Sequence, residues 1–369
     1  MAEATSSRPA GYVDEGAMIK MQSRSIRLFS TCPPSVRYQY GDDYLRKVKK
    51  VAEWCDEARI EGILVYTDNS LVDPWLVSQV ILSSTSNLAP LVALQPVYMH
   101  PYTAAKMVAT FGYLHNRRIY LNTVAGGSRN DLIALNDYTE HDDRCDRIIE
   151  YVSIMKRLFE EPGPLSFTGN YFTVKNLALK PRLPPELVPE VFVSGTSAAG
   201  VAAARKISAT LISHPGTSSG EAVNRDGPAG IRIGIIARGE SSEAWRIAYE
   251  RFPADPKGQL THALARRVSD SSWCEQLSGL GESAVERSSP YWLVPFQNYK
   301  TFCPYLVGSY DEVRREVSRY IREGFQTFIL DVPPNREELH HTAVVFDGVQ
   351  LELWVRDSAH ENHVFKPRA

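Results

Sequence analysis

Residues 118–127 are the first in the chain whose types and spacing could form a binding site. They read Arg-Ile-Tyr-Leu-Asn-Thr-Val-Ala-Gly-Gly, so a strand-like run ends in Asn122 and Thr123 and then in Gly126 and Gly127. Glycines at the carboxyl end of a buried strand let the backbone approach a ligand closely. The pattern predicts a strand whose tip faces a ligand. An ordinary strand followed by a glycine turn is the alternative.

A second candidate site lies in residues 191–200, which read Val-Phe-Val-Ser-Gly-Thr-Ser-Ala-Ala-Gly. Here a strand passes through Gly195, Thr196 and Ser197 into an alanine-rich helix. Free amides at the start of a helix, together with hydroxyl groups, suit a phosphate. Ser and Thr also cap helices that bind nothing, so simple capping is the alternative.

Three basic side chains are candidates for proton or charge handling: His100, His214 and Arg232. A lone histidine near a strand end is more often structural or solvated than catalytic. A buried arginine without a role is costly, so Arg232 is the better candidate if it points inward, where it could steady an oxygen anion. Thr67, at the tip of the second strand, is a candidate substrate contact.

The chain alternates strand-like and helix-like segments, which is typical of βα units around a parallel sheet. Eight strands are predicted at Ser25–Cys32, Gly62–Asp68, Ala89–Val97, Arg117–Gly126, Pro189–Ser197, Ala209–His214, Ile231–Arg238 and Gln326–Pro333. Helices are predicted at Tyr40–Ile60, Asp73–Thr85, Pro101–His115, Asp142–Glu160, Ala198–Ser208, Ser241–Phe252 and Tyr310–Glu323. We therefore expect an α/β fold, a closed (β/α)8 TIM barrel with insertions, in which all strand tips, including Asp331 on the eighth, share one face.

The domain organisation follows from the segments that a minimal barrel does not need. We expect an N-terminal extension at 1–24 that is flexible, a single barrel domain at 25–348 and a C-terminal tail at 349–369. Residues 165–181 read as an added hairpin. Residues 253–305 form a long insertion rich in Ser, Pro, Gly and charge, which favours a lid over the site; a surface excursion without a role is the alternative.

Composition limits the classes of partner. The 369 residues are 43% hydrophobic with a net charge of -2, so no strong field attracts nucleic acid or an anionic membrane. No apolar run reaches the roughly 18 residues of a membrane span, and the start lacks a secretory or transit pattern. The five cysteines are widely spaced, and no histidine pair has metal-ligand spacing, so we expect a cytoplasmic protein without a metal site.

Five motifs follow one another along the chain: Leu121–Gly127, His141-Asp-Asp-Arg144-Cys-Asp-Arg147, Phe167–Tyr171, Ser194–Ser197 and Ile231–Gly234. In order and spacing they resemble the luciferase-like flavin monooxygenases, most closely their alkanesulfonate monooxygenase branch, and the resemblance extends from about Ser25 to about Phe346. It implies a two-component enzyme that takes reduced FMN (FMNH2) from a separate NAD(P)H-dependent flavin reductase. With O2 as cosubstrate, the flavin would form a C4a-(hydro)peroxyflavin that oxygenates a small organic substrate. Such enzymes are commonly dimers or tetramers.

The resemblance also implies which residues bind the flavin. Gly195, Thr196 and Ser197 would hold the phosphate. Asn122, Thr123, Ala125 and Gly126 would lie along the isoalloxazine ring. Arg144 occupies the first position of the family's Arg-Tyr pair, and the second position, a phosphate-binding tyrosine in relatives, is Cys145 here.

Other positions depart from the sulfonate enzymes at the substrate end. Their histidine near the end of the seventh strand is Gly234, their cysteine after the second strand is Leu71, and the tyrosine of the eighth strand tip is Pro333. Lys300 lies near the place of their lid arginine and is a candidate substrate contact; a solvated lysine is the alternative. These changes favour a substrate other than a sulfonate, one of specialised metabolism.

Two other functions remain open. The loss of the imidazole at position 234 is compatible with a non-catalytic flavin-binding barrel. An oxidoreductase that uses the deazaflavin F420 is a third reading of the same fold. The long insertion favours the monooxygenase, since a protein that only stores flavin has less need of a lid.

Overall fold

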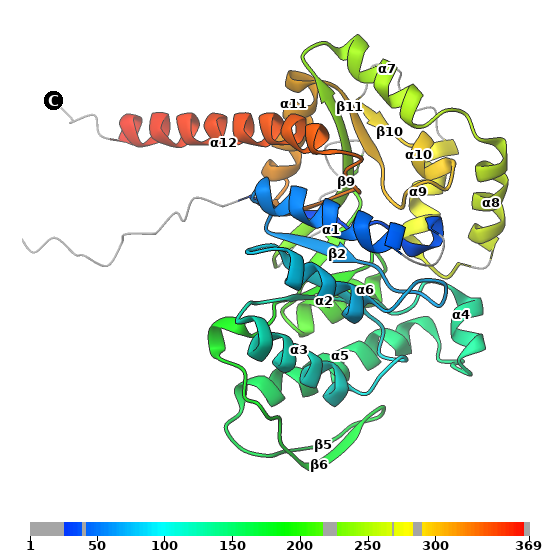
Figure 1. Cartoon of the computed structure of the whole chain (residues 1–369), viewed down its shortest axis with the longest axis vertical. Coiled ribbons are helices and arrows are strands. Elements are labelled where there is room, and N and C mark those ends of the chain that lie inside the picture. Colours follow the sequence, from blue (N-terminus) through cyan, green and yellow to red (C-terminus); the bar gives the residue numbers. More distant parts are fainter. Residues whose placement is uncertain (1–25, 39–41, 217–226, 268, 283–289, 365–369) are drawn as a thin grey trace, which may run out of the picture.

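The computed structural model describes residues 26–38, 42–216, 227–267, 269–282 and 290–364 (Figure 1). The expected extension at 1–24 lies outside the described residues. The helix α12 (Arg336–Val364) runs without a break past residue 349, where the sequence placed the start of a tail.

Eight parallel strands close into a barrel, which confirms the predicted fold class. In barrel order they are β1 (Arg27–Thr31), β2 (Gly62–Val65), β3 (Ala89–Leu94), β4 (Tyr120–Thr123), β7 (Val191–Ser194), β8 (Thr210–Ser213), β9 (Ala229–Arg238) and β12 (Phe325–Leu330). The β8–β9 and β12–β1 pairings close the ring. Each strand overlaps a predicted segment, because a barrel strand buried on both faces is a short apolar run that the sequence reveals directly.

Helices cover the barrel, and each predicted helix overlaps an observed one (Figure 1). They are α1 (Asp42–Glu57), α2 (Pro74–Ser84), α3 (Pro101–His115), α5 (His141–Glu160), α6 (Ala198–Lys206), α7 (Ser241–Arg251) and α11 (Tyr310–Arg322), with the short α4 (Arg129–Ala134) and the 3-10 turns η2 (Ser35–Arg37) and η3 (Pro185–Leu187) in addition. Local capping fixes their starts: Asp73 accepts two amides at α2, and Ser309 forms a capping box with Glu312 at α11.

The lower part of the barrel interior is a plug of apolar side chains. Phe29 packs edge-on against both Tyr120 and Phe192, with ring centroids 5.2 and 5.3 Å apart. Ile212 and Ile329 belong to the same buried cluster. Because this end is filled, a ligand can enter only at the carboxyl ends of the strands.

Two insertions depart from the minimal barrel. Strands β5 (Leu165–Thr168) and β6 (Thr173–Leu177) pair antiparallel, and the Glu150 carboxylate of α5 accepts the amides of residues 170–172 in their turn. Residues 253–305 contain α8 (Pro256–Arg267), α9 (Ser272–Glu282), β10 (Tyr291–Trp292) and α10 (Val294–Gln297). They lead into β11 (Tyr305–Ser309), a strand that the sequence did not predict, which pairs in parallel with residues 234–238 of β9.

Among the described residues, no helix is long and apolar enough to cross a membrane.

Candidate active site

Arg232 on β9 places a buried positive charge at the carboxyl end of the barrel. Its neighbours Ile231 and Ile233 pack into the outer helix-facing cluster, so alternation along the strand turns Arg232 inward. The guanidinium lies over the Tyr66 ring, 4.7 Å from its centroid, and 6.0 Å from that of Phe302. One of its terminal nitrogens donates to the Tyr66 hydroxyl.

The part of the chain that the structure describes provides no carboxylate partner for Arg232. The side chain is 8% exposed, its Nε has no hydrogen-bond partner, and it forms no ion pair with a described residue. A buried guanidinium without an anion is costly, and cation–π contacts with two rings offset only part of that cost. The site is therefore suited to an anionic oxygen.

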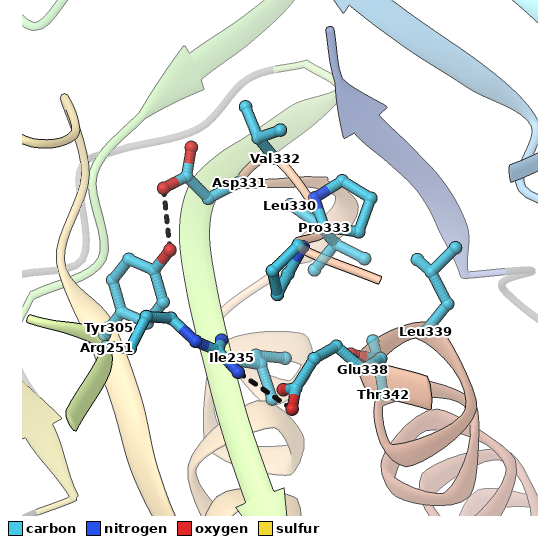
Figure 2. Close-up of a pocket in the computed structure, with 11 residues that line it drawn as sticks. Ile235, Arg251, Tyr305, Leu330, Asp331, Val332, Pro333, Glu338, Leu339 and Thr342 are labelled. Atoms are coloured by element: carbon cyan, nitrogen blue, oxygen red, sulfur yellow. Dashed lines mark hydrogen bonds and ion pairs between the residues drawn. The ribbon is translucent and has the colours of Figure 1, made fainter. Parts of the chain in front are cut away.

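Tyr305, on β11, and Asp331, directly after β12, form a hydrogen-bonded pair between two strands that both pair with β9, as Figure 2 shows. The Tyr305 hydroxyl of β11 donates to Asp331 Oδ2 over 2.7 Å. Burial, reinforced by the nearby Asp331 charge, raises the pKa of Tyr305 well above its usual value, so the phenol stays protonated. Tyr305 also fills the space beside Gly234, where a Cβ atom would meet the ring at 2.3 Å.

A small cavity adjoins this pair on the side of α12. It has a volume of about 30 Å³, space for about one water molecule, and lies between Asp331, Tyr305, Arg251 and Glu338 (Figure 2). Glu338 pairs with Arg251 over 2.8 Å and with Arg238. This cavity is too small to enclose a flavin or an organic substrate.

The predicted phosphate turn connects β7 to α6, and its Gly195 amide donates to the Ile212 carbonyl at 3.2 Å. Ser197 accepts the amide of Gly200 at 3.1 Å and so caps α6, which fits the capping alternative as well. A Cβ atom at Gly195 would meet nothing within 4 Å, so open space adjoins the turn at the amino end of α6. The Ser194 hydroxyl donates to Asn122 Oδ1 at 2.9 Å, which joins this turn to the tip of β4.

The four predicted ring-contact residues do not all face the interior. Asn122 follows Tyr120 in the strand alternation and shares its inward side. Thr123 is fully buried and donates to the Phe192 carbonyl within the sheet, and Ala125 packs against the helix layer. Gly126 has a φ of +92°, a backbone conformation that glycine adopts without strain. Thr123 and Ala125 could therefore contact a flavin only through their backbone atoms.

Arg144 on α5 is directed at the glycine end of β4. It is 3% exposed, and it donates to the Thr139 carbonyl at 2.8 Å and to the Gly126 carbonyl at 3.5 Å. Its Nε has no partner. Its neighbour Cys145 is buried, and desolvation raises the pKa of that thiol to about 11, so the thiol cannot replace the lost tyrosine as an anionic or strongly polar contact.

One part of the long insertion covers this site, and we call residues 269–276 the closing segment. Asp270 pairs with Arg144 over 3.3 Å, and its amide donates to the Gly127 carbonyl at 3.2 Å. Ser272 shares a 3.0 Å hydrogen bond with Thr196, and Gln276 shares one of the same length with His214. The closing segment thus contacts Thr196 and Arg144, two of the residues assigned to the flavin phosphate.

Trp273 continues this cover over the barrel mouth. Its ring packs against the interior cluster and lies edge-on to His214, with centroids 5.6 Å apart. Its Nε1 donates to the Phe302 carbonyl at 3.0 Å. The residue therefore connects the closing segment to the aromatic surroundings of Arg232.

The remaining predicted residues lie apart from this group. His100 caps α3 by accepting the Tyr102 amide at 3.1 Å, and its ring faces Phe172 of the hairpin. Lys300 pairs with Asp255 of the same insertion over 2.6 Å. Thr67 is half-buried directly after Tyr66. No hydrogen bond or ion pair among the described residues connects any of the three to Arg232, and their roles stay predictions.

Sequence reasoning missed Tyr305 and the closing segment. Tyr305 lies in β11, which no periodicity marked, and residues 269–276 lie inside a polar insertion without a motif. Asp331 and Tyr66 were visible only as polar or aromatic residues at strand tips. Among the described residues, no group of three or more His, Cys, Asp or Glu side chains could hold a metal ion.

A parallel eightfold barrel with a covered polar mouth defines the class of this protein, and comparison with known proteins gives the family. The chain belongs to the luciferase-like monooxygenase family, whose match spans residues 26–327. It is 32% identical over 337 residues to a 4-(gamma-L-glutamylamino)butanoyl-[BtrI acyl-carrier protein] monooxygenase, BtrO, from Niallia circulans, a match that covers 88% of this chain and 97% of BtrO.

Solved structures share the fold at low identity. EDTA monooxygenase (EmoA) from Chelativorans sp. BNC1 superposes with a TM-score of 0.64 at 17% identity, covering 90% of this chain and 95% of that one. An F420-dependent secondary alcohol dehydrogenase gives a TM-score of 0.62 at 15% identity, covering 88% and 99%. At such identities the likeness shows the fold alone, and the fold serves more than one cofactor.

Proposed function

We propose that this chain is the oxygenase of a two-component monooxygenase that uses reduced FMN, supplied by a separate NAD(P)H-dependent flavin reductase, and O2. The observation that carries the proposal is the buried guanidinium of Arg232, which lies at the barrel mouth without a carboxylate partner among the described residues. A positive charge held there suits an oxygen atom that gains negative charge during the reaction. Family membership and the open turn at Gly195 support it further.

In this proposal each part of the site has a separate task. Gly195, Thr196 and Ser197 hold the phosphate at the start of α6, assisted by Arg144. Asn122 and the backbone of residues 123–126 lie along the ring. When bound, the reduced flavin supplies the electrons that activate dioxygen. The closing segment excludes water during that step, and Arg232 stabilises the anionic oxygen.

The substrate in this proposal is not a sulfonate. Relative to the alkanesulfonate branch, the chain keeps flavin-binding motifs but has Gly234, Leu71 and Pro333 at the substrate end. The 32% identity to BtrO, whose name describes an acyl group on a carrier protein, supports an acyl chain as the first substrate class to test. Such a chain would fit the earlier expectation of a role in specialised metabolism.

The surroundings of the enzyme are also part of the proposal. We place it in the cytoplasm, where its five free cysteines would remain reduced. We also propose a homodimer or homotetramer. Light scattering at several protein concentrations tests that state, and a monomer at all of them contradicts it.

Stopped-flow spectroscopy distinguishes the proposed monooxygenase from two alternatives, a flavin-storage protein and a deazaflavin oxidoreductase. The protein is mixed with FMN, NADH, a flavin reductase and oxygen, and flavin absorbance is followed. A slowly decaying species that differs from oxidised FMN, and whose lifetime shortens in Arg232→Ala, supports oxygenation. Immediate reoxidation with free hydrogen peroxide instead indicates a flavin-storage protein. Binding of reduced F420 in place of reduced FMN would favour the deazaflavin oxidoreductase.

A further inference from the structure

The space beside Gly234 is occupied by a side chain from another strand. A Cβ atom at Gly234 would lie 2.3 Å from two carbons of the Tyr305 ring, closer than real side chains approach. In the branch that the sequence resembles, this position carries an imidazole. Tyr305 in this position and a side chain at position 234 are therefore mutually exclusive, and the phenol fills the space where a side chain at position 234 would begin.

The phenol brings a carboxylate with it. Asp331 follows the inward-facing Ile329 by two residues, and its amide donates to the Ile233 carbonyl at 3.2 Å, which fixes the end of β12 beside β9. The Tyr305 hydroxyl binds Oδ2 over 2.7 Å, as the dashed line in Figure 2 shows. Oδ1 accepts no hydrogen bond from a described residue.

The other ionisable side chains around this pair are less suited to accept a proton from a ligand. Burial raises the pKa of the Cys303 thiol to about 12, and the Asp331 charge adds to this effect. Arg232 on β9 and Arg251 on α7 offer only hydrogen-bond donors, so neither is a proton acceptor. Glu338 on α12 is engaged with Arg238 and Arg251, which outweigh the opposing effect of burial and lower its pKa. Asp331 is a carboxylate of this cluster that keeps one oxygen, Oδ1, without a hydrogen bond from a described residue.

We propose that Asp331 transfers the proton in the oxygenation reaction and that Tyr305 is its positioning residue, the two together replacing the lost imidazole. This inference rests on the proposed function. Overall, substrate–H, O2 and FMNH2 give substrate–OH, FMN and water. The proton that leaves the substrate passes to Asp331 Oδ1 and returns to the oxygen atom that departs as water, so Asp331 ends unchanged.

The test uses two near-isosteric variants of the full chain with its reductase. Asp331→Asn keeps an oxygen for the Tyr305 hydroxyl but cannot take up the proton, so kcat should fall by about 10²–10⁴-fold with little change in KM. Tyr305→Phe keeps the ring that fills the space at Gly234. Its missing hydrogen bond no longer favours the carboxylate, so the acidic limb of the pH–rate profile should move up by about one pH unit.

Tyr291→Phe is the matched control, since it also removes a buried tyrosine hydroxyl, one that donates to the Pro215 carbonyl. It should leave the pH profile in place. A readout without turnover comes from ¹³C NMR of aspartate carboxyl groups in the flavin-free protein. The signal lost in Asp331→Asn identifies Asp331, and its titration should move to higher pH in Tyr305→Phe but not in Tyr291→Phe.

The possible failures are distinguishable. If Asp331→Asn binds FMN, folds as stably as the wild type and retains its kcat, the inference is wrong while the proposed function stands. An NMR titration that Tyr305→Phe leaves unmoved overturns the positioning role. If the wild-type chain itself yields no oxygenated product with any acyl substrate and reduced FMN, the proposed function fails, and the proton-transfer role of Asp331 fails with it.

Discussion

The contact between Asp270 and Arg144 predicts that the closing segment and the flavin phosphate compete for the same guanidinium. Asp270 Oδ2 lies 3.3 Å from Arg144 Nη2, where the phosphate would also bind. Changing Asp270 to Asn removes the charge but keeps the shape. The closed arrangement should then lose stability, and flavin should bind more tightly, because less free energy is needed to open the site.

The size of the effect follows from the exposure of the pair. The Arg144 side chain is 4% exposed and the Asp270 side chain 34%, so the pair lies between a buried and a surface ion pair. We expect it to contribute about 1 kcal/mol to the closed state. That free energy corresponds to an about fivefold lower dissociation constant for FMN in Asp270→Asn.

The assay is an anaerobic titration of the protein with reduced FMN, in which calorimetry measures the dissociation constant. Asp255→Asn is the matched control, because it makes the same change in the same insertion at a carboxylate that pairs with Lys300 instead. Hydrogen exchange gives a second readout, since the Asp270 amide, bonded to the Gly127 carbonyl, should exchange faster when flavin is bound. Unchanged or weaker binding by Asp270→Asn, or equal effects of the two variants, would refute the competition.

Three further predictions follow from single contacts. Ser197→Asp should abolish flavin binding by charge repulsion, while Ser197→Asn should retain it. Asp and Asn both cap helices well, so the two variants differ mainly in charge. Equal binding of reduced FMN by the two variants would show that the phosphate does not bind at this turn. Gly234→Ala should lower the free energy of unfolding by about 1–3 kcal/mol in a urea titration, because its Cβ atom meets the Tyr305 ring. Gly239→Ala, whose Cβ atom would meet open space, should leave that free energy unchanged. A Gly234→Ala variant as stable as the wild type contradicts this. Two guanidinium groups lower the pKa of Glu338 despite its burial. Its stabilising contribution is therefore full above about pH 4.3, the pKa of an unfolded glutamate, and is lost as the pH falls through the lower pKa of the folded state. Glu338→Gln should make the free energy of unfolding depend less on pH below that point, and an unchanged pH profile would disprove this.

The sequence predicted the barrel well because its signals are local. A fully buried strand such as β3 is an apolar run between polar turns, and a covering helix begins at a capping residue such as Asp73. Only a few folds are compatible with a chain in which such strands and helices alternate. The carboxyl ends of the strands therefore lie at one rim, as predicted, since a closed parallel barrel brings them together.

The orientation of individual side chains was less predictable. In residues 122–126 the motif marks a likeness between sequences, but only the pleat decides that Asn122 faces inward while Thr123 and Ala125 pack elsewhere. Lys300 illustrates the same limit. Its partner Asp255 lies 45 residues away, and no spacing rule connects two residues of an irregular insertion.

The amino-acid sequence by itself determined the architecture, the class of chemistry to look for and the place of Arg232. It could do so because hydrophobic periodicity and strand ends depend on residues that are close together in the sequence. Tertiary structure alone decided that the Tyr305 ring fills the space at Gly234, that its hydroxyl meets Asp331 and that Asp270 covers Arg144. Those contacts join residues 26 to 126 positions apart, and they form only when the closed barrel brings distant segments to the same rim.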